Sequence, residues 1–533
     1  MKQLLLPITA AVLFAADLPN QFFSFGSPVF GLIALIPLYI ALHQADRLRT
    51  AAAMGALYGA TVTLLAHYWL GNFGAFAAWT LGGPVLGYTV YNTLLAMVLY
   101  SLLRLPGAWR PPVFAAAWTG YELLKGLGYL GFPWGYAAYS FSNVLPLMQI
   151  ADITGVYGLS FIIVYANAAC AELLLVLRHA PPGRHGLRTA LLNLLIAVSL
   201  FAGSAMYGQY RLQRLPEPDS SMQVLLIQQN SDPWQPDGLQ MTLATLQRLS
   251  QPAVDRQDID LIVWSESSLP VPYQRSRSQL DFIQQFNAPL LTGNPYIPHN
   301  SPGSRWNAVI LIDPDSGTIV QRYGKRRLVP FAEHIPLWET APVNWFFREI
   351  VGLRSPWTPA DEVVVFEIPV RDSALDSVRI GVPISFEGSF AVLNRDFVRS
   401  GADLLLNLTN NSWSQTESAQ YQQFAVTRFR AIEARRPLGL ATISGLTSTV
   451  DISGRLLDSL PMFQAAALLT DIPLYTDMPL TPYHRFGNVF AWAMLLVAAV
   501  LLILRMAGLF PANHSNYTRF RRHSPDSRDP TAR

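Results

Sequence analysis

Three polar residues in the second half of the chain have side chains that could together carry out acyl transfer. Glu266 follows the apolar run LIVW, Lys325 follows the run TIVQRYG, and Ser385 ends the run GVPI. A carboxylate can take the proton of a hydroxyl nucleophile, and an ammonium can stabilise the oxyanion that forms when the nucleophile attacks a carbonyl. These residue types are therefore the components of a candidate acyl-transfer site.

Each of the three residues also has a purely structural interpretation. Carboxylates and lysines near strand ends are commonly solvated charges, and a serine there often caps a following helix, which GSFAVLNRDFV would supply. His334 stands beside Glu333, but the nine histidines show no HExxH or similar spacing, so we expect no metal site. No Walker or dinucleotide glycine fingerprint is present, and we expect no cofactor.

The elements around these residues alternate between strand and helix. Short, apolar, β-rich runs are typical of strands covered on both faces, and they occupy 222–228, 259–264, 289–293, 307–313, 362–368, 378–384, 403–408 and 438–443. Helical spacing of apolar residues predicts helices at 238–249, 278–286 and 420–434. DPDSG at 313–317 and DISG at 451–454 look like hairpin turns. We expect an α/β domain in which polar residues gather at the carboxyl ends of the strands.

The composition of the whole chain indicates a membrane protein. Hydrophobic residues make up 51% of the 533 residues and charged residues only 14%, which is too apolar for an ordinary soluble protein. The single cysteine, Cys170, lies in an apolar run, which excludes a disulfide framework and a cysteine-based metal site. The net charge of +3 is small and the basic residues are scattered, so nucleic acid is not an expected partner.

Long apolar segments define the expected domains. A bilayer core about 30 Å thick needs roughly 20 apolar helical residues, and segments of this kind lie at about 4–22, 26–44, 52–71, 82–103, 111–127, 146–177, 189–208 and 488–508. We therefore predict a membrane domain at 1–212 with seven transmembrane helices, a soluble domain at 213–485, and an eighth transmembrane helix with a basic tail at 486–533. Glu122 and Lys125, three residues apart in the fifth segment, are expected to pair.

Basic residues in the short loops predict the orientation of the soluble domain. If the eight segments alternate, one side of the membrane carries Lys2, Arg47, Arg49, Arg104, Arg110, Arg178, Arg184, Arg188, Arg519, Arg521 and Arg522. That side is expected to be cytoplasmic, which places the soluble domain on the opposite side. LFAAD in the first segment also resembles a signal-peptide cleavage site, and removal of that segment would leave the downstream topology unchanged.

A series of longer motifs, in order along nearly the whole chain, resembles the apolipoprotein N-acyltransferase family. The motifs include GFPWGYAAYS at 131–140, GVYGLSFIIVYANA at 155–168, QQNSDPW at 228–234, WSES at 264–267, YGKRRLVPFAEHIP at 323–336, NLTNNSW at 407–413 and RAIEARRPLGLATISG at 430–445. The resemblance implies a nitrilase-like αββα sandwich with a Glu-Lys-Cys triad, carried by about eight transmembrane helices. It also implies a bacterial inner-membrane enzyme whose soluble domain is periplasmic.

The resemblance implies a role for each candidate site residue. Glu266 would be the general base and Ser385 the nucleophile, while Lys325 and the backbone N–H of Phe386 would stabilise the oxyanion. The supporting carboxylates would be Glu333 and Glu387, which keep the lysine charged and oriented. Trp234 and Trp413 match family positions near the site and are candidate substrate-binding residues.

The reaction implied by the resemblance is a ping-pong acyl transfer. The nucleophile attacks a membrane phospholipid ester to form an acyl-enzyme, and the N-terminal amine of an S-diacylglyceryl-cysteine lipoprotein then takes the acyl chain. The protein is expected to act as a monomer.

The nucleophile is where the sequence departs from the family pattern. The family has cysteine, tyrosine and glutamate where this chain has Ser385, Phe386 and Glu387. A serine hydroxyl is a far weaker acid than a thiol, so the carboxylate base must remove a proton that is held more tightly. Two other functions stay open: a catalytically impaired homologue that binds lipoprotein or phospholipid, and a membrane-anchored amidase-like hydrolase in which water replaces the amine.

Overall fold

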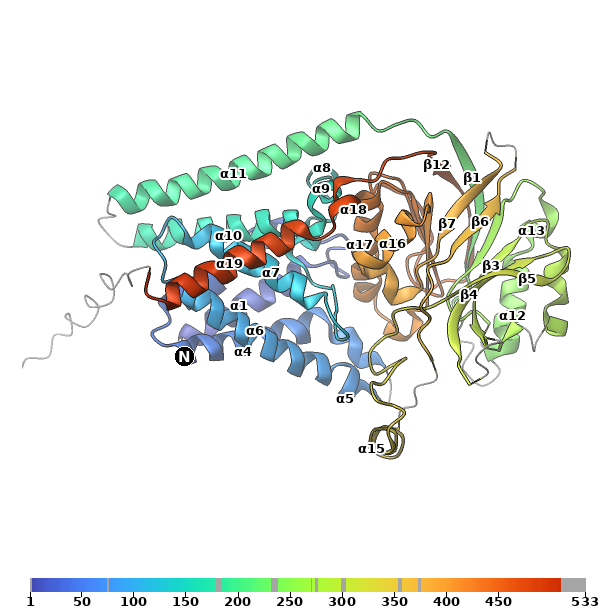
Figure 1. Cartoon of the computed structure of the whole chain (residues 1–533), viewed down its shortest axis with the longest axis horizontal. Coiled ribbons are helices and arrows are strands. Elements are labelled where there is room, and N and C mark those ends of the chain that lie inside the picture. Colours follow the sequence, from blue (N-terminus) through green and yellow to red (C-terminus); the bar gives the residue numbers. More distant parts are fainter. Residues whose placement is uncertain are drawn as a thin grey trace, which may run out of the picture.

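The protein consists of a helical region and an α/β region that pack end to end (Figure 1). The structure is a computed structural model that describes residues 2–73, 76–178, 184–231, 238–269, 271–273, 277–298, 303–352, 357–371 and 375–509. The helices of the first region run roughly along the long axis of the molecule, and two sheets with their covering helices form the other end.

The α/β region is built on two six-stranded sheets. The first has the order β12-β1-β2-β3-β4-β5 and the second β11-β10-β9-β8-β7-β6. In each sheet the central strands are parallel (β1 to β3 and β7 to β9) and the outer strands are antiparallel. The strands are β1 Ser220–Gln228, β2 Leu261–Trp264, β3 Leu290–Tyr296, β4 Trp306–Asp313, β5 Thr318–Gly324, β6 Val365–Pro369, β7 Ser377–Gly381, β8 Leu404–Thr409, β9 Leu438–Thr442, β10 Ser448–Val450, β11 Leu456–Ser459 and β12 Ala466–Leu474.

Alternating side chains of the buried strands form two apolar cores, which produces the expected αββα sandwich. Val224 and Leu226 of β1 face the core between the sheets, whereas Leu225 and Ile227 face the helices on the outside. Helices α12 (Gly238–Leu249) and α13 (Pro252–Asp255) contribute to that outer core, and α16 (Ala391–Arg399) and α17 (Glu417–Ala434) pack on the second sheet. The predicted fold class is confirmed.

Among the elements that differ from the sequence predictions are one helix and one edge strand. The segment predicted as a regular helix at 278–286 is a 3₁₀ helix, η4 (Arg277–Gln285), with a kink at Leu280. Strand β12 has no counterpart among the predictions because Asp471 and Pro473 interrupt its apolar pattern. It lies at the edge of its sheet, where a proline is tolerated.

The helical region contains broken as well as continuous helices. Its longer helices are α1 Lys2–Asp17, α3 Ile36–Gln44, α4 Leu48–Ala66, α6 Gly82–Leu102, α7 Arg110–Lys125, α10 Val156–Arg178, α11 Arg184–Gln213 and α19 Val489–Met506. Among the described residues, five helices are long and apolar enough to cross a membrane. The predicted segment 146–177 is divided into α8 (Leu145–Met148), α9 (Ala151–Thr154) and α10, with Gly155 in a left-handed conformation at the last break.

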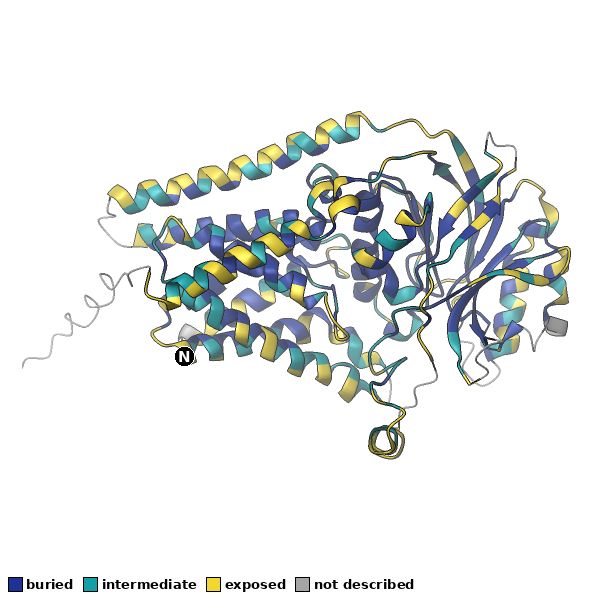
Figure 2. Ribbon diagram, viewed as in Figure 1, coloured by how far each residue is buried: buried dark blue, intermediate teal, exposed yellow. Residues whose placement is uncertain are grey.

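The outer surface of the helical region is apolar, as a lipid-facing surface must be. Figure 2 shows many exposed residues along α11 and α19. The exposed apolar residues of these helices include Leu192, Leu195, Leu496 and Ile503. The count of eight spans and the domain boundaries at 212 and 485 stay predictions. Helix α11 ends at Gln213, and the chain re-enters the helical region after α18 (Pro482–Phe486).

The charges of Glu122 and Lys125 interact, but among the described residues the two side chains form no direct salt bridge. The Glu122 carboxylate accepts hydrogen bonds from Trp118 Nε1 at 3.1 Å and from the backbone N–H of Ala137 at 2.8 Å. Lys125 Nζ donates instead to the carbonyl of Trp134. The chain that follows α7 folds back over the end of this helix. Its backbone provides a hydrogen-bond partner for each of the two side chains.

Helix α17 joins the two regions. Phe424 and Ala431 pack against the apolar side chains of the second sheet, whereas Val426, Phe429 and Ile432 belong to the core of the helical region. The helix is buried along almost its whole length, so the second sheet and the helical bundle share it as a common layer (Figure 1).

Candidate active site

Glu266 and Lys325 form a buried ion pair at one edge of the first sheet, where β2 and β5 both end. Glu266 lies two residues after β2, and Lys325 follows β5 directly. Their exposed fractions are 4% and 1%, so neither is a solvated surface charge. Lys325 Nζ lies 3.0 Å from Glu266 Oε1 and 2.8 Å from Glu333 Oε1. Burial alone would lower the pKa of this lysine, but the charges of Glu266 and Glu333 outweigh burial and raise the pKa above its ordinary value. Lys325 therefore remains an ammonium.

Asn307 is a component of this cluster that the sequence analysis missed. Its Nδ2 donates to Glu266 Oε1 and to Glu333 Oε1, each at 2.9 Å. Its backbone carbonyl accepts from the N–H of Lys325 at 2.8 Å. The second Glu266 oxygen accepts from the backbone N–H of Asn410 at 2.7 Å. A lone asparagine near the start of a strand gives no sequence signal of such a role.

Ser385 lies on a tight turn between strand and helix. It has a φ of 51°, a left-handed conformation that costs a residue with a side chain about 1–2 kcal/mol. The amide of Asn407 in β8 fixes the turn by donating to the carbonyl of Pro383 at 2.8 Å and to that of Ser385 at 3.2 Å. The helix-capping interpretation of Ser385 is wrong, because α16 begins at Ala391 with Phe390 as its N-cap.

Glu387 connects the serine turn to the segment after Lys325. This fully buried carboxylate accepts hydrogen bonds from the N–H groups of Ile384 (2.9 Å), Arg326 (2.7 Å) and Arg327 (2.9 Å). Burial raises the pKa of Glu387, and these donors oppose the effect. Within the described ranges, no hydrogen bond joins the Ser385 hydroxyl to Glu266 or Lys325. The Glu387 contacts hold the serine turn next to the segment that follows Lys325, which in turn pairs with Glu266.

The chain is similar to known proteins over nearly its whole length. The family model of the apolipoprotein N-acyltransferase N-terminal domain matches residues 10–169, and that of carbon-nitrogen hydrolase matches residues 224–476. A Treponema pallidum protein named apolipoprotein N-acyltransferase 2 is 34% identical over 97% of this chain and 95% of its own length. The chain belongs to the apolipoprotein N-acyltransferase family.

Other members of the apolipoprotein N-acyltransferase family are similar over comparable lengths. The Geobacter metallireducens protein of that name is 32% identical and covers 94% of this chain and 95% of its own. Among solved structures, an amidase from Nesterenkonia sp. is 17% identical with a TM-score of 0.37, and it covers 52% of this chain and 96% of its own.

The aromatic candidates of this family member lie where the site meets the helical region. The Phe386 ring stacks on Trp134, with centroids 5.7 Å apart. Trp413 packs between Trp69 and Phe73 at centroid distances of 5.7 and 5.1 Å. Trp234 lies outside the described residues. The serine turn therefore packs against an aromatic side chain of the helical bundle.

Proposed function

We propose that this protein transfers a fatty-acyl group from a membrane phospholipid to the N-terminal amine of S-diacylglyceryl-cysteine lipoproteins. Family membership supports N-acylation of lipoproteins by a membrane protein. The observation that carries the mechanism is the Lys325 ammonium held between the carboxylates of Glu266 and Glu333, beside the turn that presents Ser385.

The first half-reaction forms an oxyester on Ser385. Glu266 takes the hydroxyl proton as Oγ attacks the ester carbonyl carbon of the phospholipid, and the Lys325 ammonium and the N–H of Phe386 stabilise the oxyanion. The carbon–oxygen bond to the glycerol then breaks, and the proton held by Glu266 passes to the departing alkoxide. A lysophospholipid leaves, and the acyl chain remains on the enzyme.

The second half-reaction forms the amide. The lipoprotein amine attacks the oxyester carbonyl, Glu266 accepts a proton from the amine, and the proton returns to Ser385 Oγ as the ester bond breaks. Glu333 and Glu387 hold Lys325 and the serine turn in place. No step requires a cofactor.

We extend the proposal to the membrane location, the orientation and the subunit number of the enzyme. The basic loops favour an inner-membrane protein with eight spans whose α/β domain is periplasmic, where lipoprotein amines are available. Nothing in the reaction requires a second subunit, and we propose a monomer.

Mass spectrometry of the intact full-length protein tests this function. After incubation with phospholipid, the protein should gain one fatty-acyl mass on Ser385, and a diacylated lipopeptide should remove it. Ser385→Ala should abolish the adduct. Ser389→Ala should retain it, because the Ser389 hydroxyl has no hydrogen-bond partner among the described residues. Thermal unfolding of both variants verifies that they are folded.

The two alternative functions predict different results in the same experiment. A catalytically impaired homologue would bind phospholipid without forming an adduct. An amidase-like hydrolase would form the adduct and lose it to water as fast as to the lipopeptide. Either result would contradict acyl transfer.

A further inference from the structure

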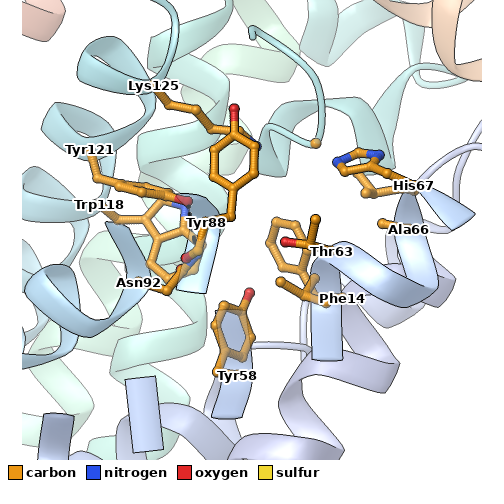
Figure 3. Close-up of a pocket in the computed structure, with 13 residues that line it drawn as sticks. Phe14, Tyr58, Thr63, Ala66, His67, Tyr88, Asn92, Trp118, Tyr121 and Lys125 are labelled. Carbon is orange, nitrogen blue, oxygen red and sulfur yellow. Dashed lines mark hydrogen bonds between the residues drawn. The ribbon is translucent and has the colours of Figure 1, made fainter. Parts of the chain in front are cut away.

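The cavity inside the helical bundle is too small for a lipid. Figure 3 shows this cavity, which lies between α1, α4, α6 and α7 and is lined by Lys125, His67 and Tyr58 among others. It has room for about one or two water molecules. Any lipid that this part of the bundle binds must therefore lie on its outer surface.

The start of α19 marks the level of the lipid headgroups on the side of the α/β region. The helix has 18 residues, so at 1.5 Å per residue it is about 27 Å long, close to the roughly 30 Å of a bilayer's hydrocarbon core. A helix that only just matches the core has both of its ends near headgroups. The junction between α18 and α19, at Gly487, therefore lies where lipid phosphates gather.

Exposed apolar side chains begin at this same level. Val489, Trp492 and Leu496 follow each other at helical spacing along α19, and their exposed fractions are 58%, 49% and 64%. Phe486, directly before the junction, is 70% exposed. Aromatic residues are enriched where a membrane helix meets the headgroups. This side of α19 therefore faces lipid, and α18 lies at the membrane surface.

Arg395 of α16 lies against the junction with its guanidinium unpaired. A side chain at Gly487 would collide with Arg395 Nη1, so the guanidinium lies directly on the glycine backbone. Its Nε is buried, and among the described residues the guanidinium forms neither a hydrogen bond nor an ion pair. A guanidinium has five N–H donors in a planar fork that matches a phosphate group. Arg395 therefore has its full donor capacity available for an anion.

The acidic residues nearest in the fold are paired with other arginines. Asp396, the next residue of α16, lies 3.1 Å from Arg326 Nη1. Glu433, at the end of α17, lies 2.9 Å from Arg430 Nη2. The positive charge of Arg395 is therefore left for a partner outside the chain.

Arg485 supplies a second cation at the same place. It is exposed and precedes Gly487 by two residues. Its one side-chain hydrogen bond among the described residues joins Nε to the carbonyl of Leu480. The two other guanidinium nitrogens of Arg485 are therefore open to the membrane surface beside Phe486.

We infer that the junction of α16, α18 and α19 binds the phosphate group of an anionic lipid, with Arg395 as the main partner and Arg485 as the second. Phe486 and Val489 would contact the glycerol and the first carbons of the chains, which free phosphate lacks. The site uses no residue of the proposed mechanism and goes beyond the proposed function. Because α16 begins six residues after Ser385, a lipid bound here ties the helix that follows the serine turn to the membrane surface.

A binding experiment on full-length Ser385→Ala protein tests the inference without turnover. Native mass spectrometry in detergent measures the binding of phosphatidylglycerol and of diacylglycerol with the same chains. Adding Arg395→Met should weaken the binding of one phosphatidylglycerol molecule about tenfold and leave diacylglycerol binding unchanged. Arg485→Met should have a smaller effect in the same direction, because this residue is exposed. Equal phosphatidylglycerol binding with and without Arg395→Met would overturn the inference.

Arg322→Met is the matched control, because it removes the same charge far from the junction. Arg322 is an exposed residue of β5, in the sheet that lies away from the bundle (Figure 1), and it lies over the Tyr296 ring. This variant should bind phosphatidylglycerol as the parent does. Inorganic phosphate at millimolar concentration should leave the lipid bound. Full displacement by inorganic phosphate would assign the site to the free anion and overturn the lipid assignment.

Thermal unfolding separates lipid binding from a structural role of Arg395. Without lipid, Arg395→Met should keep or raise the melting temperature, because the guanidinium has no partner in the chain to lose. It should lose part of the increase that phosphatidylglycerol gives the parent. A large loss of stability with that increase intact would overturn the inference. A failure of acyl transfer by the Ser385 enzyme, with this lipid binding retained, would contradict the proposed function alone.

Discussion

At the scale of single residues, the site depends on a neutral side chain that holds two like charges together. Glu266 and Glu333 both direct an oxygen at Lys325, and Asn307 donates to the same two oxygens. An amide can do this because it donates hydrogen bonds without adding charge, whereas another cation would compete with the lysine. The asparagine thus positions Glu266, the proposed general base.

Asn307→Leu should lower the rate of acyl-enzyme formation roughly 100-fold, or by about 3 kcal/mol of activation free energy. The two carboxylates lose the donor that holds both of them at Lys325, so Glu266 is less well positioned. Intact-mass kinetics measure the rate, and thermal unfolding measures the stability. The control is Asn287→Leu, whose amide bonds to the carbonyls of Val254 and Arg256 away from the site. A slower rate that is matched by an equal loss of folded protein would indicate a structural role only.

At the scale of elements, the close approach of β3 to the segment after β2 positions the base. A Cβ on Gly293 of β3 would lie 2.5 Å from the Ser267 nitrogen and 2.6 Å from the Glu266 Cα. Backbone atoms of a buried strand end cannot yield as a flexible side chain would. This position therefore requires glycine if Glu266 is to reach Lys325.

Gly293→Ala should cost about 1–3 kcal/mol of folding stability and at least tenfold in acyl-enzyme formation, because the strand end carrying Glu266 must shift. Thermal unfolding and intact-mass kinetics provide the two readouts. Gly303→Ala is a matched control, since a Cβ there would meet no atom within 4 Å. Wild-type kinetics in Gly293→Ala would show that the position of Glu266 does not depend on this packing.

The sequence patterns predicted the strands and helices better than they predicted the contacts between them. The buried strands were predictable because parallel strands covered on both faces are continuous apolar runs, and Glu266 and Ser385 because they end such runs. The contacts of Asn307 and Glu387 depend on which strands become neighbours, and local periodicity carries no information about that pairing. The same limit explains why Glu122 and Lys125, neighbours on a helix, each bind a loop that returns from elsewhere.

At the scale of the whole molecule, a carboxylate of α17 caps the start of a helix in the bundle. Glu433 accepts from the backbone N–H of Val156 at 3.1 Å and from Arg430 at 2.9 Å. Burial raises the pKa of Glu433 to about 7, although Arg430 and the backbone donor oppose it. The nearby His484 has a pKa lowered to about 3 by burial, so it stays neutral in the range where Glu433 titrates.

This raised pKa predicts that stability falls as pH rises from about 4.5 to 7. In that window the folded state holds a proton on Glu433 that the unfolded state has lost, which costs on the order of 3 kcal/mol at most by pH 7. Melting temperatures in detergent should decline across the window, and Glu433→Gln should reduce the decline. If the stability of the parent protein rises with pH throughout this window, and the stability of Glu433→Gln changes with pH at the same rate, the raised pKa of Glu433 is contradicted.

A buried ion pair also connects the two regions, and its charges depend on each other. Arg435, directly after α17, donates to Asp152 Oδ2 at 2.7 Å, and Arg211 lies 3.1 Å from the same oxygen. Asp152→Asn leaves the buried charge of Arg435 uncompensated and should cost about 3–5 kcal/mol, whereas Arg435→Met should cost less because Asp152 keeps Arg211 as a partner. The double variant should cost less than the sum of the two, and thermal unfolding in detergent measures this coupling.

The exposed pair of Arg379 and Asp403 supplies the control, where the single changes should cost less than about 1 kcal/mol. Strict additivity of the buried pair would mean that the apolar contacts of α17 alone hold the catalytic region on the bundle.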